Sequence, residues 1–232
     1  MQRSSVVKFL YSGAPLAALS LLVSPMAHAS ITIYSQPTQF PDNAYYASQS
    51  PFATTYDNFT LPGSASVTGL TWVGEFFNPS THAPITSFTI SFYGDNAGVP
   101  GTQLFTDTIA GDANETYIGL GENNDGLDPG YSYSTDLDSA FSVDAGTTYW
   151  LSIVPDLSFP PQWAWDSGSG GDGLSYQIFE GTDYPRQTDD TFSLTGTVPE
   201  PSPVSGILIG ALGLSCLAAI RFRKRSQTSP SH

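Results

Sequence analysis

Two tryptophans separated by one residue are the side chains whose type and spacing could best bind a ligand. Trp163 and Trp165 lie in the run 160–166, Pro-Pro-Gln-Trp-Ala-Trp-Asp. Side chains two residues apart in an extended strand point to the same face, so the two rings would share one side. Such rings could stack on sugars, with Gln and Asp nearby, or they could fill the core of a β-sandwich. The sequence favours the core and leaves carbohydrate binding open.

Two acidic, glycine-rich stretches supply hard oxygen ligands of the kind that calcium takes. Residues 121–128 contain Asp125 and Asp128, and residues 166–173 contain Asp166 and Asp172. Calcium binds six to eight oxygens, often from flexible loops. Neither stretch has the EF-hand spacing, because Gly121 stands where the first Asp of the loop would be. The sequence favours a turn-capping role for these aspartates, so we expect no cofactor; calcium bound by these four residues is the alternative.

The residues that most enzymes use for catalysis are scarce in the middle of the chain. Between residues 30 and 197 there is one histidine, His82, with no cysteine and no lysine. This composition excludes a zinc site of the usual His and Cys type and makes a catalytic triad implausible. A glycosidase or lyase needs only two carboxylates, and Glu75, next to a strand-like segment, is the candidate. The remaining acids lie mostly in turns, so we predict that the protein is not an enzyme.

Charge is distributed very unevenly along the chain. All 21 acidic residues lie between residues 42 and 200, where Arg186 is the one basic residue, which gives that segment a formal charge of −20. Such a surface repels nucleic acid and anionic lipid and attracts divalent cations or basic partners. It also simply keeps a protein soluble. We therefore expect no nucleic-acid partner.

Alternating apolar and polar residues predict that residues 30–197 form a domain of short strands. The clearest are 88–93, 149–154 and 191–195, and further strands are predicted at 31–34, 54–61, 66–77, 103–109, 114–120, 131–141 and 174–180. Turn signals separate them, among them Asp128-Pro129-Gly130. Strands spaced by 8–12 residues predict an all-β fold, an antiparallel β-sandwich or jelly roll.

The N-terminal residues 1–29 have the features of a secretory signal peptide. Arg3 and Lys8 precede an apolar stretch, and Ala27-His28-Ala29 has the small-x-small form of a cleavage site. We predict cleavage between Ala29 and Ser30, which exports the remainder of the chain.

The C-terminal residues 198–232, here called the sorting tail, have three parts in a fixed order. Pro199-Glu200-Pro201 comes first, the uncharged run 204–220 predicts a transmembrane helix, and Arg221, Arg223, Lys224 and Arg225 follow it. A helix of this length spans about 25 Å, and the basic cluster would stay in the cytoplasm. The domain between the two ends would then face outward.

The sorting tail resembles the PEP-CTERM signal of bacterial exported proteins, whose name comes from the motif at Pro199, Glu200 and Pro201. The resemblance covers about an eighth of the chain. It implies that an exosortase-type membrane transpeptidase acts near the motif, after transient anchoring in the inner membrane, and releases the protein to the cell surface or exterior. The alternative is a permanent anchor with a proline-rich stalk.

Stretches of the middle domain are similar to uncharacterised exported domains that often precede such a tail. They include residues 56–61, 67–72, 88–95 with 98–101, and 145–153. The similarity implies no activity. The sequence therefore predicts an exported, non-enzymatic protein of the cell surface or exopolysaccharide matrix, or alternatively a lectin-like module, calcium-assisted or not, that binds polysaccharide.

Overall fold

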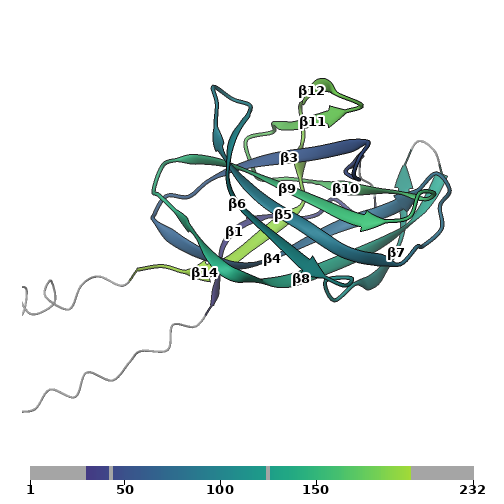
Figure 1. The fold of residues 1–232 in the computed structure, drawn as a ribbon, viewed down its shortest axis with the longest axis horizontal. Coiled ribbons are helices and arrows are strands. Elements are labelled where there is room, and N and C mark those ends of the chain that lie inside the picture. Colours follow the sequence, from purple (N-terminus) through teal and green to yellow (C-terminus); the bar gives the residue numbers. More distant parts are fainter. Residues whose placement is uncertain (1–29, 42–43, 124–125, 200–232) are drawn as a thin grey trace, which may run out of the picture.

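The computed structural model describes residues 30–41, 44–123 and 126–199, which fold into two packed antiparallel β-sheets (Figure 1). No helix occurs among these residues. The prediction of an all-β domain is confirmed, and the two-sheet arrangement is that of a β-sandwich.

The first sheet has eight strands and is built around a long central strand. Its main path runs β1 (Ile31–Gln36), β14 (Phe192–Thr197), β4 (Ala65–Phe77), β10 (Gln162–Gly168) and β13 (Asp189–Asp190). The strand β8 (Gly126–Val143) also pairs with β4 and carries β7 (Thr116–Asn123) at its other edge, while the short β2 (Tyr45–Ala47) pairs with β10.

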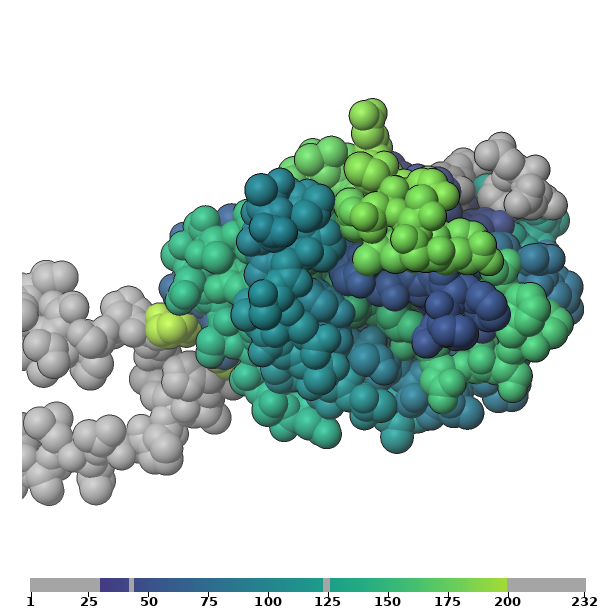
Figure 2. Space-filling model, turned by 45° about the horizontal axis from the view of Figure 1, so that its top comes forward, coloured from purple at the N-terminus to yellow at the C-terminus, as the bar shows by residue number. Residues whose placement is uncertain are grey.

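The second sheet has six strands in a single path. In order they are β12 (Thr182–Arg186), β11 (Ser175–Phe179), β3 (Ala53–Thr60), β9 (Thr148–Leu157), β5 (Ile85–Asp95) and β6 (Pro100–Ala110). The β11–β12 hairpin forms one edge of this sheet. Figure 2 shows it in light green, lying against the dark blue segment that includes its neighbour β3.

Aromatic side chains fill the space between the sheets. Phe88 of β5 packs edge-on against Trp72 of β4, with ring centroids 5.0 Å apart, and against Trp163 of β10 at 5.8 Å. All three side chains are at most 1% exposed. Because each buried aromatic side chain removes a large apolar area from water, a core of this kind stabilises the domain without a disulfide.

Most predicted strands are present, but one predicted turn is wrong. Asp128-Pro129-Gly130 lies inside β8, where Pro129 pairs with Leu120 of β7. This part of β8 has only β7 beside it, since pairing with β4 begins at Gly130, so the missing amide hydrogen of Pro129 breaks no ladder on the second side. The sequence reasoning also missed β2, β12 and β13.

The two ends of the described domain lie together. Ile31 pairs with Gly196, and both ends leave the sandwich on the same side (Figure 1). The strand β4 begins beside this point, where Ser66 pairs with Thr197, and its 13 residues carry the chain about 40 Å to Phe77 at the opposite end. The surface around Phe77 is therefore remote from both chain ends.

Candidate ligand-binding groove

Trp163 and Trp165 belong to the core. They lie on β10 and are 0% exposed. The indole of Trp163 donates to the Tyr133 hydroxyl at 3.1 Å, and that of Trp165 donates to the Thr191 carbonyl at 2.7 Å. Neither ring has a face open to a sugar, so the carbohydrate-binding role considered for this pair is corrected to a packing role.

The aspartates considered for calcium do not come together. Asp128 and Asp166 are buried strand residues, whereas Asp172 lies exposed in a turn, where it accepts hydrogen bonds from the Leu174 amide and the Asn58 side chain. Asp125 lies outside the described residues. In the part of the chain that the structure describes, no group of three or more His, Cys, Asp or Glu side chains could hold a metal ion.

Glu75, the carboxylate considered for glycoside hydrolysis, is also buried. It is 0% exposed, and its side chain lies against Gly121 of β7, where a Cβ atom would come within 1.7 Å of Oε1. His82 is exposed, with Nε2 2.6 Å from Glu115 Oε1. Glu75 therefore lies in the interior and His82 on the surface.

Most residues assigned to export and sorting lie outside the described ranges. These are Ala27, Ala29, Glu200, Pro201, Arg221, Arg223, Lys224 and Arg225, together with the predicted helix 204–220. Ser30 and Pro199 are described, and both are exposed at the ends of the domain. Among residues 30–41, 44–123 and 126–199 there is no helix long and apolar enough to cross a membrane.

The most distinctive surface feature is an aromatic pocket of about 350 Å³ at the end of the sandwich remote from the chain ends. It lies between the β2 edge of the first sheet and the β11–β12 edge of the second. Its described lining consists of Tyr45, Tyr46, Ala47, Phe77, Gln162, Gln177, Phe179, Tyr184 and Arg186. The five aromatic rings are half-buried or exposed, so each keeps some surface toward solvent.

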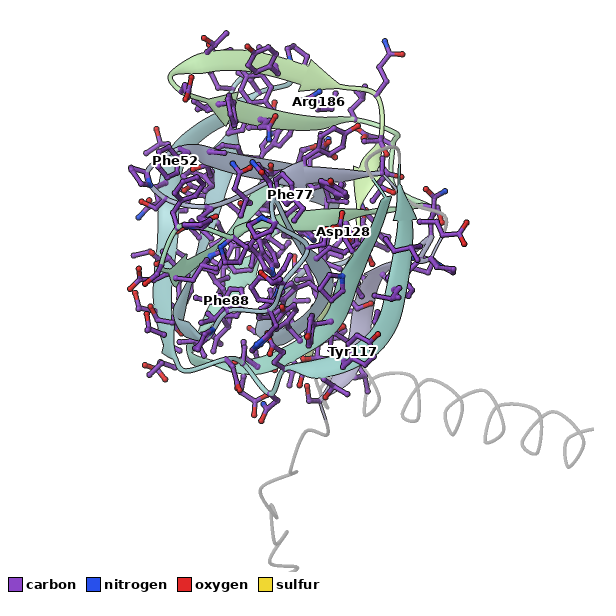
Figure 3. All side chains as sticks on the ribbon, turned by 90° about the vertical axis from the view of Figure 1, so that its right-hand side faces the viewer. Phe52, Phe77, Phe88, Tyr117, Asp128 and Arg186 are labelled. Carbon is purple, nitrogen blue, oxygen red and sulfur yellow. The ribbon has the colours of Figure 1, made fainter. Side chains whose placement is uncertain are left out.

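A second pocket of about 320 Å³ continues the first. It is lined by Tyr45, Phe77, Asn78, Pro79, Ser80 and Asp128. The two pockets share Tyr45 and Phe77, whose ring centroids are 4.8 Å apart. We call the two pockets together the aromatic groove; Arg186 lies at one end and Asp128 at the other, with Phe77 between them in the view of Figure 3.

Partly buried hydrogen bonds hold the short strand β2 in place beneath the groove. The carbonyl of Ala47 accepts from Gln177 Nε2 of β11 at 2.8 Å and from Thr55 Oγ1 of β3 at 2.9 Å. On its other side, β2 pairs with β10, with Tyr46 opposite Trp165. The strand thus bridges the two sheets, and its tyrosines have a fixed backbone from which to present their rings.

Arg186 combines with the tyrosines of the groove. Its guanidinium lies 4.4 Å from the ring centroid of Tyr46 and 5.4 Å from that of Tyr184, and it donates to Gln177 Oε1. Cations attract the negative face of aromatic rings, so these contacts stabilise both the ring positions and the charge. Burial raises the pKa of Tyr46, against the lowering effect of Arg186, and keeps the phenol a neutral donor and acceptor.

A different hollow, of about 440 Å³, lies on the outer face of the first sheet. Its lining includes hydroxyls that neighbour one another across four strands: Ser35, Ser193, Thr71 and Ser134. Ser35 and Ser193 already bond one another at 2.8 Å. Hydroxyls on an open sheet are well solvated and provide no stacking surface, so we regard the aromatic groove as the better binding site.

The sequence reasoning passed over the groove, because its residues are spread from Tyr45 to Arg186 and no local pattern unites them. One signal was available: the single basic residue of an acidic domain lies two residues after Tyr184.

No family model matches this chain, and no curated protein matches it significantly. The resemblance of the sorting tail, and that of the middle domain, therefore rest on the residues quoted for them.

Proposed function

We propose that the protein is an exported, non-enzymatic carbohydrate-binding protein of the cell exterior, and that the aromatic groove binds the saccharide. The observation that carries this proposal is the gathering of five partly exposed aromatic rings with amide and charged groups in one continuous groove.

Such a groove suits sugar chemistry because a pyranose ring has apolar C–H faces and a rim of hydroxyls. Aromatic faces bury the former, and fixed polar groups bond the latter. The half-buried Gln162 in the lining has an amide with both donors and an acceptor, while the buried Gln177 holds Arg186 and β2 in place. The two joined pockets provide space for more than one sugar unit, which favours an oligosaccharide or polysaccharide segment over a single sugar.

The position of the groove agrees with export on a tethered tail. The chain ends leave one end of the sandwich, and the groove lies at the other, about 40 Å away along β4. If the sorting tail holds the protein at a membrane, the groove points away from that membrane and toward surrounding polysaccharide.

The binding proposal is tested with a glycan array probed by the folded domain, residues 30–197 of the exported form. We expect binding that falls at least tenfold in Tyr46→Ala, because this ring forms part of the first pocket. The matched control is Tyr117→Ala, which removes another tyrosine, 56% exposed on β7 and outside the groove. If no glycan binds, with or without calcium, or if both variants weaken binding equally, the proposal is wrong.

The export proposal is tested separately in cells with the full chain. Replacing Pro199, Glu200 and Pro201 by alanine removes the extended, proline-fixed strip that a transpeptidase would recognise. We expect full-length protein to accumulate in the membrane fraction and release to fall. Unchanged release would contradict processing by an exosortase-type enzyme, and the tail would then be a plain anchor.

A further inference from the structure

We propose that the aromatic groove selects acidic saccharides, and that the Arg186 guanidinium binds the carboxylate of a uronate unit. This inference rests on the proposed carbohydrate binding and adds the chemical class of the ligand. The inference concerns Arg186. Its position in the groove and its unused hydrogen-bond donors both indicate an anionic ligand.

The first argument is charge. Arg186 is the only lysine or arginine between residues 30 and 200, against 21 acidic residues, and it lies in the wall of the groove. At physiological ionic strength, charges separated by more than about 8 Å are largely screened, so the acidic surface elsewhere does not cancel the local field of Arg186. An anionic ligand therefore has one favourable place on this domain.

The second argument is hydrogen bonding. A guanidinium has five N–H donors in a planar fork. In the described residues Arg186 makes one hydrogen bond, to Gln177, and no carboxylate lies within ion-pair distance of it. The Nε is buried, so the donors that a ligand could use are those of the terminal Nη groups that the bond to Gln177 leaves free. A carboxylate that accepts from these groups would form charge-assisted hydrogen bonds.

The third argument is orientation. The tyrosines stacked on the guanidinium restrain its plane, since Tyr46 and Tyr184 lie 4.4 and 5.4 Å from it. A fork held in one plane loses little entropy when it binds a planar carboxylate. A sugar ring stacked on a neighbouring tyrosine would carry its carboxylate at the ring edge, where the fork can reach it.

One buried acidic group, Asp190, interacts with Arg186 from inside the domain. Asp190 is fully buried and interacts electrostatically with Arg186 and Tyr46. Burial raises the pKa of Asp190 well above its usual value, mainly because desolvation disfavours the carboxylate. No ion pair joins Asp190 to Arg186 among the described residues, so this carboxyl does not occupy the donors of the guanidinium.

The test compares an oligogalacturonate, which carries the carboxylates, with its uncharged, fully methyl-esterified form, by calorimetric titration of the wild-type domain. We expect the free acid to bind about tenfold to a hundredfold more tightly, as charge-assisted hydrogen bonds require. Arg186→Gln should remove this preference, and Arg186→Lys should restore part of it, because the charge returns without the fork. Raising the salt concentration should also reduce the preference.

The outcomes separate this inference from the function on which it rests. Equal binding of acid and ester, or a preference that survives in Arg186→Gln, would overturn the role of Arg186 while leaving carbohydrate binding intact. Binding of neutral glycans alone would do the same. If Arg186→Gln fails to fold, as judged by near-ultraviolet circular dichroism, the comparison of acid and ester on the wild-type domain still decides. Failure of every glycan to bind would remove both proposals.

Discussion

The interior of the sandwich and the aromatic groove are built from the same kinds of residue but use them in opposite ways. In the interior, Trp72, Trp163 and Trp165 are at most 1% exposed and pack against rings from the other sheet or from their own. In the groove, Tyr45, Tyr46 and Phe77 keep part of their surface toward solvent.

The difference comes from which face of a strand a residue occupies and whether that face is covered. Residues on the inner faces of β4, β10 and β5 are covered by the opposite sheet. Beyond Phe76 of β4, which is fully buried, the next residue Phe77 is already partly exposed at the end of the strand. Whether an aromatic residue of this domain stabilises the core or faces the groove thus depends on its exact position along the strand.

The largest expected effect is loss of stability in the interior. Trp163→Ala removes a fully buried ring that contacts Phe88 and donates a hydrogen bond to Tyr133, so we expect the free energy of unfolding to fall by about 3–5 kcal/mol. Urea denaturation followed by circular dichroism measures this change. For a domain of ordinary stability, such a loss leaves little folded protein.

The groove variant Tyr46→Ala provides the contrast. Its free energy of unfolding should fall by less than that of Trp163→Ala, because its ring is only half-buried, while its glycan binding should fall. If Tyr46→Ala proved as destabilising as Trp163→Ala, the division between a packing region and a binding region would be wrong. Tyr46 would then belong to the core in energetic terms.

The sequence predicted the interior far better than the groove. The segments predicted at 66–77 and 149–154 are present as β4 and the middle of β9, because apolar residues recur over most of their length. The strand β2 has only three residues, and β12 contains Pro185 and is exposed along most of its length, so neither shows a pattern that periodicity can detect.

The tryptophan pair shows the other limit of sequence reasoning. Spacing by two correctly placed Trp163 and Trp165 on one face of a strand, but it could not say whether that face was covered. Coverage depends on β5 and β9 of the opposite sheet, which are distant in sequence. The groove likewise depends on β2, β4, β10, β11 and β12 meeting at one end, which is a property of topology and not of any segment.

A smaller effect is expected from the acidic groups that lie in the interior behind the groove. Asp57 and Asp190 are both 0% exposed, and the Asp190 amide donates to Asp57 Oδ2. Burial is the main cause that raises the pKa of both groups, and for Asp57 the nearby Asp190 raises it further.

The contribution of these two carboxyl groups to the free energy of unfolding is larger in acid than at neutral pH, because their pKa values are raised in the folded state. A carboxyl whose pKa is higher in the folded than in the unfolded protein binds its proton more tightly when folded. Its stabilising contribution is complete below the unfolded pKa, near 3.9, and is lost as the pH rises through the folded pKa. Asp190→Asn keeps the shape of the side chain but cannot ionise, so its unfolding free energy should fall less as the pH rises.

The measurement is urea denaturation of the wild-type domain and two variants at several values between pH 4 and pH 8. Asp112→Asn is the matched control, since it removes one negative charge from an exposed residue and so reports the general effect of lowering the acidic charge. We expect the gain in stability at pH 8 to be larger for Asp190→Asn than for Asp112→Asn. Equal gains would mean that overall charge repulsion governs the pH dependence of stability, and that the burial of Asp190 does not. The buried carboxyl would then affect stability no differently from an exposed one.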